Sequence, residues 1–231
     1  MRYREFQAPT GLEPSVACLW QQDAVDAGEL RVVPDGCVDL LWFGDHLIVA
    51  GADTGPLVWK SVPPIVGVRL RPGVAGGVLG VPASEVRDQM VPLGEFWPEA
   101  HRLTGFPLHQ SEQLRALTQL VLRHRSAPDP LTAAAAHMLA EADTRVGTVA
   151  DDLGVSERQL HRRMSDAVGY GPKTLARVMR LRRLVGTTAG SLADRAHASG
   201  YASQSHMSDE VRRLTGLTPV RFLEDPRITA A

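Results

Sequence analysis

Three side chains that can donate hydrogen bonds lie close together on one face of a predicted helix. Arg158, His161 and Arg162 are spaced at helical intervals, and Leu160 and Met164 form an apolar stripe on the opposite side. An arginine can donate two hydrogen bonds to O6 and N7 of one guanine, so these positions suit contacts with base edges in the DNA major groove. For each arginine the alternative is a surface side chain that contacts only phosphate, and for the histidine it is a solvated ring.

The segment that carries these residues is repeated about 47 residues further along the chain, from Ser156 to Ser203. In each copy a serine can cap the start of the helix, and a glycine followed by a proline can end it. A short helix precedes each copy, over Thr148–Leu153 and Ser191–Ser199, and a tight turn with a glycine joins the two helices. This order is typical of a helix-turn-helix. The matching pairs are Ser156 and Ser203, Leu160 and Met207, Met164 and Val211, Gly169 and Gly216, and Pro172 and Pro219.

The second helix offers weaker donors at the matching positions, which are Gln204, Ser205 and Ser208. Gln204 can pair with an adenine or serve at the helix end. The acidic pair Asp209-Glu210 lies beside them, and Asp209 can accept a hydrogen bond from a cytosine amine or repel phosphate. Basic residues at the flanks of both helices are expected to contact phosphates and so position the protein. They are Arg163, Lys173, Arg212, Arg213 and Arg221.

Charge is distributed unevenly along the 231 residues, although the formal total is only −1. Residues 1–130 contain 11 basic and 15 acidic side chains, and residues 131–231 contain 14 and 11. Between residues 155 and 221 there are 12 basic and 5 acidic side chains, an excess of +7. Such a basic segment favours a polyanion, because each phosphate contact releases counterions. A solvated charged face is the alternative.

The first 80 residues have the short apolar and alternating runs of a β-rich structure, at the spacing of a small barrel or sandwich. The runs are Leu30–Val33, Cys37–Phe43, Leu47–Ala50, Leu57–Lys60 and Ile65–Leu70. Helical patterns begin after Pro82. They comprise a stretch Glu85–Met90 capped by Ser84, a stretch within Leu93–Leu103, an amphipathic helix Glu112–His124 headed by Ser111, and a helix from Leu131 to Glu141 after a proline-containing linker at 126–130.

Asp39 stands out in the strand-rich half, because a carboxylate within an apolar run must find a partner or line a pocket unless it faces outward at an edge. Trp42 and Trp59 are candidates for the same pocket, which suits an apolar or aromatic ligand. Packing in the core is the alternative for Trp20, Trp42, Trp59 and Trp97 alike. Cys37 is expected to be a small buried thiol, with a redox or metal role as the alternative.

Several classes of protein find no support in the sequence. The eight histidines are dispersed and there are two cysteines, so neither a metal-ligand spacing nor a disulfide framework is present. No apolar run approaches the roughly 20 residues of a membrane helix, and the first residues lack the layout of a signal peptide. We therefore expect a cytoplasmic protein that is not an enzyme, has no metal or cofactor and does not bind membranes.

Residues 131–225 resemble the DNA-binding module of the AraC family of bacterial transcription regulators. The matching residues are Leu153–Leu160, Gly169 with Pro172, Arg180-Leu181, and Gly200-Tyr201 through Gly216–Pro219. The string Val33–Trp42 is similar to sensor domains that precede this module in related regulators. The resemblance implies that the positions named above on the two repeated helices contact DNA.

The chain departs from the family pattern at two places. Glycines at 186 and 190 interrupt the connecting helix about one and a half turns after Arg180, and a glycine costs nearly 1 kcal/mol in a helix interior. We therefore expect a short or flexible connector between the two helix-turn-helices. The second departure is Asp209, where family members often carry a basic residue.

Together these patterns predict an α+β chain with two domains. We expect a β-rich barrel-like or sandwich-like sensor or dimerisation domain with closing helices over residues 1–127, and an all-α double helix-turn-helix domain over residues 128–231. The expected function is sequence-specific regulation of transcription in response to a small molecule or another signal. Double-stranded DNA is the expected partner, and an effector, RNA polymerase and a second copy of the chain are further candidates. Two alternatives stay open: a small-molecule-acting or cupin-like enzyme with accessory helices, and a ligand-free module that recruits polymerase.

Overall fold

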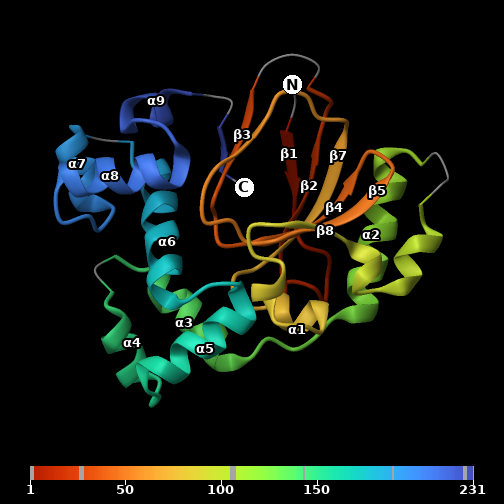
Figure 1. Cartoon of the computed structure of the whole chain (residues 1–231), viewed down its shortest axis with the longest axis horizontal. Coiled ribbons are helices and arrows are strands. Elements are labelled where there is room, and N and C mark those ends of the chain that lie inside the picture. The colour runs from red at the N-terminus through yellow and green to blue at the C-terminus, as the bar shows by residue number, and fades with distance from the viewer. Residues whose placement is uncertain are drawn as a thin grey trace.

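The strands form one large and one small sheet in the N-terminal half of the molecule (Figure 1). The computed structural model describes residues 3–25, 29–104, 108–142, 144–188, 190–225 and 228–230. Within these ranges the large sheet has six strands in the order β1-β2-β7-β4-β5-β8, and the small sheet has the order β6-β3-β9. The strands are β1 (Tyr3–Phe6), β2 (Val16–Gln22), β3 (Leu30–Val33), β4 (Val38–Phe43), β5 (His46–Ala50), β6 (Leu57–Trp59), β7 (Ile65–Leu70), β8 (Met90–Pro92) and β9 (Ile228–Ala230).

All five runs predicted as strands are confirmed, with ends that agree within one residue. The sequence patterns do not predict β1, β2, β8 or β9. In β2 buried and partly buried residues alternate, but the sequence from Val16 to Trp20 is apolar throughout and so shows no alternation. A bulge between Val16 and Cys18 also shifts the register of this strand. The strand β9 pairs in parallel with β3, and its partner lies at the other end of the sequence. The C-terminal half is therefore helical except for this strand, which completes the small sheet.

The two faces of the large sheet pack against different neighbours. On β4, Val38, Leu40 and Trp42 point into the main hydrophobic core, which the helix α2 (Gln110–His124) covers. Asp39 and Leu41 point to the opposite face, towards the small sheet. Both faces are thus buried, which explains why β4 is buried at five of its six residues.

The C-terminal half contains two helix-turn-helix pairs, as predicted. Its helices are α3 (Pro130–Ala140), α4 (Val146–Asp152), α5 (Glu157–Val168), α6 (Pro172–Gly186), α7 (Leu192–Ala198), α8 (Gln204–Thr215) and α9 (Pro219–Glu224). Ser156 and Ser203 are the N-caps of α5 and α8, and each hydroxyl oxygen accepts a hydrogen bond from the backbone N–H three residues on, at 3.2 and 3.1 Å. Both helices end at a glycine in the left-handed conformation, with φ of 106° at Gly169 and 71° at Gly216.

The connecting helix ends at Gly186, where the glycines predict an interruption, but the prediction that the connector is short is wrong. The connecting helix α6 begins at Pro172 rather than at Arg180 and has 15 residues, so it is about 22 Å long. A proline suits the first position of a helix, and the apolar stripe from Leu175 to Leu184 is buried along the whole helix. Gly186 is the last residue of α6, where a glycine lowers the stability of the helix only slightly.

Two predicted helix starts are also wrong. Ser84 lies inside a short 3-10 helix, η1 (Ala83–Glu85), and no helix reaches Met90, because Met90 pairs with Ala50 as part of β8. The helix α2 begins at Gln110, so Ser111 does not cap it. Its first turn is closed instead by the carboxylate of Glu112, which accepts a hydrogen bond from the backbone N–H of His109 at 2.9 Å. The predicted helical stretch around Pro98 is present as two 3-10 helices, η2 (Leu93–Glu95) and η3 (Pro98–Arg102).

One continuous hydrophobic core joins the strand-rich and helical halves. The C-terminal part of α5 packs against η1 and the short helix α1 (Ala75–Leu79), where Gly76 lets the backbone carbonyl of Asp166 approach closely (Figure 1). The turn before β4 packs against α6, since a Cβ on Gly36 would lie 2.8 Å from Cε of Met179. The helices α5 and α8 and the connecting helix α6 therefore belong to the same packed unit as the sheets.

Candidate nucleic-acid interface and ligand cavity

The donor face of α5 is exposed to solvent. Arg158, His161 and Arg162 are exposed, whereas Leu160 and Met164 are completely buried. The ring of His161 lies against the backbone of Gly171, which restricts its position. In the described part of the chain neither Arg158 nor Arg162 forms an ion pair, so both guanidinium groups are available to a partner.

The corresponding face of α8 carries fewer available donors. Gln204, Ser205 and Asp209 are exposed. Ser208 is partly buried, and its hydroxyl donates to the backbone carbonyl of Gln204 at 2.9 Å. The base-contact roles of these residues and of those on α5 remain predictions.

Glu210 follows Asp209 directly but points into the protein, so the expectation of an acidic pair facing DNA is wrong for this residue. Its side chain is only 7% exposed. Its carboxylate lies 3.2 Å from Nε of Arg177 and 3.2 Å from Nη2 of Arg180, both on α6, and 3.5 Å from Nε2 of His206. The guanidinium of Arg180 also lies over the ring of Tyr201. This network attaches α8 to the connecting helix.

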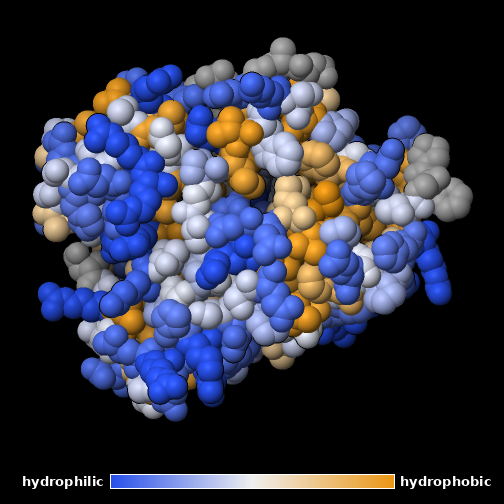
Figure 2. All heavy atoms as spheres, in the orientation of Figure 1, coloured by the Kyte–Doolittle hydropathy of each residue, from blue (hydrophilic) through white to orange (hydrophobic). Residues whose placement is uncertain are grey.

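The predicted phosphate-contacting residues lie on the surface. Lys173, Arg212, Arg213 and Arg221 are exposed, and hydrophilic side chains gather over α4–α5 and α7–α8 (Figure 2). Arg163 is exposed as well, but its Nη1 lies 3.3 Å from the carboxylate of Asp129, which caps α3. A phosphate contact by Arg163 therefore competes with this ion pair.

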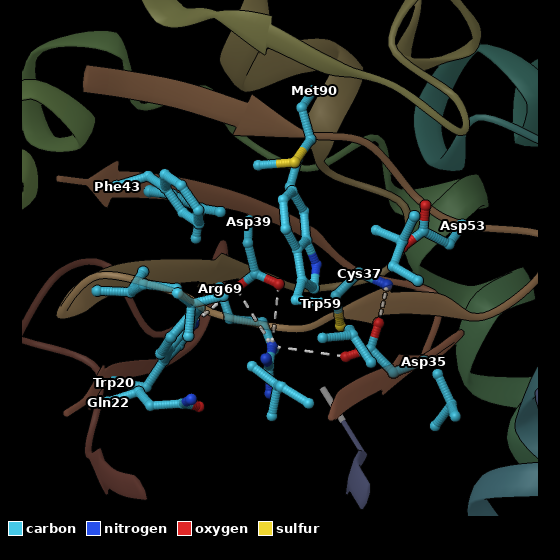
Figure 3. A pocket seen from close by; sticks show the side chains of 18 of the residues that line it. Trp20, Gln22, Asp35, Cys37, Asp39, Phe43, Asp53, Trp59, Arg69 and Met90 are labelled. Carbon is cyan, nitrogen blue, oxygen red and sulfur yellow. Dashed lines mark hydrogen bonds and ion pairs between the residues drawn. The ribbon is translucent and has the colours of Figure 1, made fainter. Parts of the chain in front are cut away.

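A cavity opens between the large and the small sheet (Figure 3). Its volume is about 80 Å³. Most of its wall is aromatic or aliphatic, with side chains from β2, β3, β4, β6 and β7. Its polar lining includes Gln22, Asp35, Asp39, Asp53 and Arg69, together with Tyr3.

Strand register brings the polar groups of the cavity together. Asp39 on β4 lies directly opposite Arg69 on β7, and Nε of Arg69 is 3.3 Å from Oδ1 of Asp39. Trp20 on β2 reaches the same carboxylate by lying across Gly67, and its Nε1 donates to Oδ1 of Asp39 at 2.8 Å. The prediction that Asp39 must find a partner is thus confirmed, and Asp39 also lines the cavity.

Asp35 joins this cluster from the turn before β4. Its Oδ1 accepts a hydrogen bond from the backbone N–H of Cys37 at 2.8 Å, and its Oδ2 lies 3.5 Å from Nε of Arg69. Burial raises the pKa of Asp35, and the charge of Arg69 opposes that effect only in part. Burial acts to lower the pKa of Arg69, but Asp39 and Asp35 together outweigh it and raise this pKa, so Arg69 stays charged.

Trp42 does not line the cavity, which corrects its assignment as a pocket residue. It lies one position beyond Leu41 on β4, so its indole points to the opposite face and is buried in the main core at 2% exposure. Trp97 belongs to the same core and stacks on His124, with ring centroids 4.1 Å apart. Trp59 lines the cavity together with Trp20, and its contact with a ligand stays a prediction.

Cys37 is a small buried thiol, as predicted, and burial raises its pKa well above the usual value. It therefore stays protonated and unreactive at neutral pH. Across the described ranges no three His, Cys, Asp or Glu side chains are grouped so that they could hold a metal ion. No helix within these ranges has the length and apolar composition to cross a membrane.

Gly67→Ala should destabilise the protein by about 1–3 kcal/mol, because a Cβ at this position would lie 2.7 Å from Cζ2 of the buried Trp20. Denaturant unfolding followed by tryptophan fluorescence measures the effect. Gly55→Ala is the matched control, since a Cβ at Gly55 has no neighbour within 4 Å. Equal stability of the two variants would contradict the packing of Trp20 on Gly67.

Asp53→Asn should raise stability at alkaline pH more than at acidic pH. Burial, and then the nearby charges of Asp88, Asp35 and Asp39, raise the pKa of Asp53 to about 7. Between pH 4 and 7 the unfolded chain releases this proton while the folded protein keeps it, so wild-type stability falls as pH rises through this window. The advantage of the variant should therefore grow by about 1–2 kcal/mol from pH 4 to pH 8, after allowance for solvent screening. Thermal unfolding across this range measures it, and a constant difference would contradict the raised pKa.

Sequence reasoning missed two residues that build these sites, Arg69 and Gln22, and placed a third, Glu210, on the wrong side of its helix. Arg69 had a usable signal, because it is a charged residue inside the apolar run Ile65–Leu70 and therefore needed a buried partner such as Asp39. Gln22 and Glu210 had no comparable signal, since their burial depends on the strand β2 and on the packing of α8 against α6.

Two family models match separate parts of the chain. Residues 149–225 match a family described as a helix-turn-helix domain, and residues 4–92 match a family described as a domain of unknown function. A search of curated proteins found no match to the chain.

Structures of ToxT from Vibrio cholerae are similar to the chain along most of its length. One at 1.65 Å resolution is 9% identical and aligns over 96% of this chain and 97% of its own, with a TM-score of 0.42. Another, of wild-type ToxT from strain SCE256 with an unsaturated fatty acid bound, is 11% identical and aligns over 89% and 90%, also with a TM-score of 0.42.

The match over residues 149–225 coincides with the elements from α4 to α9, which include both capped helices α5 and α8. The β-rich half precedes them and contains the cavity. The chain therefore carries a helix-turn-helix domain over residues 149–225, behind a β-rich N-terminal part.

Proposed function

We propose that this protein is a transcription regulator that binds two adjacent segments of the DNA major groove, one with α5 and one with α8. The observation that carries the proposal is the repeated helix with a serine cap, a buried apolar stripe and an exposed polar face, within a segment that matches a helix-turn-helix family. On one face of the duplex the two segments would be separated by about 10 base pairs.

The roles of individual side chains follow from their exposure. Arg158, His161 and Arg162 would contact bases from α5, and Gln204, Ser205, Ser208 and Asp209 would do so from α8. Exposed basic residues at the helix flanks would contact phosphates and so position both helices without selecting sequence. The set is Arg163, Lys173, Arg212, Arg213 and Arg221.

The N-terminal domain would make this binding responsive to a small molecule held in the cavity between the sheets. Residues 1–127 form the proposed sensor domain and residues 128–231 the proposed DNA-binding domain, with β9 returning to the sensor. A second copy of the chain and RNA polymerase are further proposed partners. We propose no catalytic reaction, because the polar groups of the cavity are mainly paired with one another.

Binding of the full chain to duplex DNA should weaken steeply as salt rises. Four to eight phosphate contacts would give a slope of roughly −4 to −7 in a plot of log affinity against log salt. Cognate sites can be selected from random DNA and then titrated between low and physiological salt, with random duplexes as the control. A slope near zero, or no binding at low salt, would overturn the proposed function.

A further inference from the structure

We propose that the cavity between the two sheets binds an organic cation, a small ammonium compound with an aromatic or alkyl body, and not a carboxylate. The proposal names the ligand class of the sensor described under the proposed function. It follows from the balance of charges in the cavity wall, from two buried polar atoms without hydrogen bonds, and from the aromatic surface around them.

Carboxylates outnumber cations in the cavity wall. Asp35, Asp39 and Asp53 line it, and Arg69 is the one described lining residue with a positive charge. The guanidinium of Arg69 is already shared among acidic partners, since it also lies 3.7 Å from the carboxylate of Glu5 on β1. A carboxylate ligand would have to displace these partners, whereas a cation would meet negative charge that Arg69 alone does not balance.

Two buried polar atoms in the wall have no hydrogen-bond partner among the described residues. They are Oδ2 of Asp35 and Nε2 of Gln22, on side chains only 5% and 3% exposed. Oδ2 of Asp35 has only its ion pair with Nε of Arg69, at 3.5 Å, and an ammonium group has three donors, one of which would give this oxygen a hydrogen bond. The amide of Gln22 adjoins the same space, and a half-turn about its last side-chain bond presents its oxygen in place of its nitrogen (Figure 3).

Aromatic rings provide a surface for the body of such a ligand. Trp20 and Trp59 line the cavity together with Phe43, and Phe43 packs on Trp59 with ring centroids 5.5 Å apart. The faces of aromatic rings attract cations, and the guanidinium of Arg69 already lies 5.8 Å from the ring centroid of Trp20. The cavity therefore combines the two features that organic ammonium compounds favour, unbalanced carboxylates and aromatic walls.

The ionisation of the carboxyl groups agrees with this charge balance. Burial raises the pKa of both Asp35 and Asp53, that of Asp53 to about 7. Without a ligand Asp53 holds a proton at neutral pH for part of the time. A bound ammonium group would stabilise their charged forms, so binding of a cation should release protons, whereas binding of a carboxylate should take protons up.

The test compares three probes of similar size by isothermal titration calorimetry with the full chain at pH 7. The probes are 2-phenylethylammonium, 3-phenylpropionate and the neutral 2-phenylethanol. We expect the ammonium to bind at least tenfold more tightly than either of the others. Repeating the titration in phosphate and in Tris, which differ in ionisation enthalpy, should show a net release of protons.

Two variants make the test specific. Asp53→Asn removes a carboxylate that has no hydrogen-bond partner among the described residues, so the fold should tolerate it. It should weaken ammonium binding at least threefold and leave the alcohol unchanged. Asp45→Asn is the control, because Asp45 lies in the exposed turn between β4 and β5 and outside the cavity wall. This variant should change the affinity for neither the ammonium nor the alcohol.

Tighter binding of the carboxylate, proton uptake with the ammonium, or no binding of any probe would overturn the proposal. Equal losses in the Asp53→Asn and Asp45→Asn proteins would overturn it as well. The salt titration of DNA binding is independent of these measurements. If the protein binds DNA but does not prefer the ammonium, only the proposed ligand class is rejected. If it prefers the ammonium but does not bind DNA, only the proposed regulator function is rejected.

Discussion

Replacing Arg162 with alanine is expected to weaken binding to the selected DNA site by about 5- to 150-fold, the equivalent of roughly 1–3 kcal/mol. Arg162 is exposed on α5, and in the described part of the chain no acidic side chain forms an ion pair with its guanidinium that would compete with DNA. A bidentate contact with one guanine would be lost, so base preference should relax at one position. Binding assays with the selected site and with single-base variants measure both effects.

Arg213→Ala is the matched control for this prediction. Arg213 is equally exposed, but it lies in the last turn of α8, where a contact with phosphate is expected. Its loss should weaken binding to the selected site and to random DNA by the same factor. If Arg162→Ala also reduced both affinities equally, the assignment of Arg162 as a base-contacting residue would be wrong.

The helix-turn-helices are predictable from the sequence because their signals are local. A serine cap, an apolar stripe at helical spacing and a terminating glycine lie within about 14 residues, and the bounds of α5 and α8 follow from them directly. Strands such as β3 and β7 are equally accessible, since turn formers mark both ends.

The parts that the sequence does not predict depend on contacts between distant segments. The side of β4 on which Trp42 lies is set by the order of six strands, and the burial of Glu210 is set by the packing of α8 on α6. The length of the connecting helix is underestimated because its glycines can be read from the local sequence, whereas the core that buries the stripe from Leu175 to Leu184 cannot. The same holds for the acidic cavity, since Arg69 contacts Asp39 through the register of β4 and β7, and contacts Asp35 through the turn before β4.

The contacts between the halves suggest how a ligand in the cavity would influence DNA binding. Arg182 on α6 donates to the backbone carbonyl of Asp35, and Arg31 on β3 donates to the carbonyl of Thr215 at the end of α8. Both Asp35 and β3 belong to the cavity wall. A ligand that moves Asp35 would therefore act directly on α6, and a ligand that moves β3 would act directly on α8.

Glu210→Ala is expected to lower the free energy of unfolding by about 1–2 kcal/mol, because it removes the buried carboxylate at the centre of a partly exposed ionic network and leaves Arg180 without its partner. Since this network attaches α8 to α6, the variant should also lose discrimination at the DNA segment contacted by α8 while keeping that at the segment contacted by α5.

The neighbouring Asp209→Ala is the control. Asp209 is exposed, so its loss should change stability by less than about 0.5 kcal/mol and should tighten binding to random DNA by relieving repulsion from phosphate. Urea unfolding and binding to sites altered in one half measure the two variants. If Glu210→Ala were as stable as the wild type, the network would not be what holds α8 on α6. If Asp209→Ala weakened binding to the cognate site but not to random DNA, Asp209 would be assigned to a contact with a cytosine.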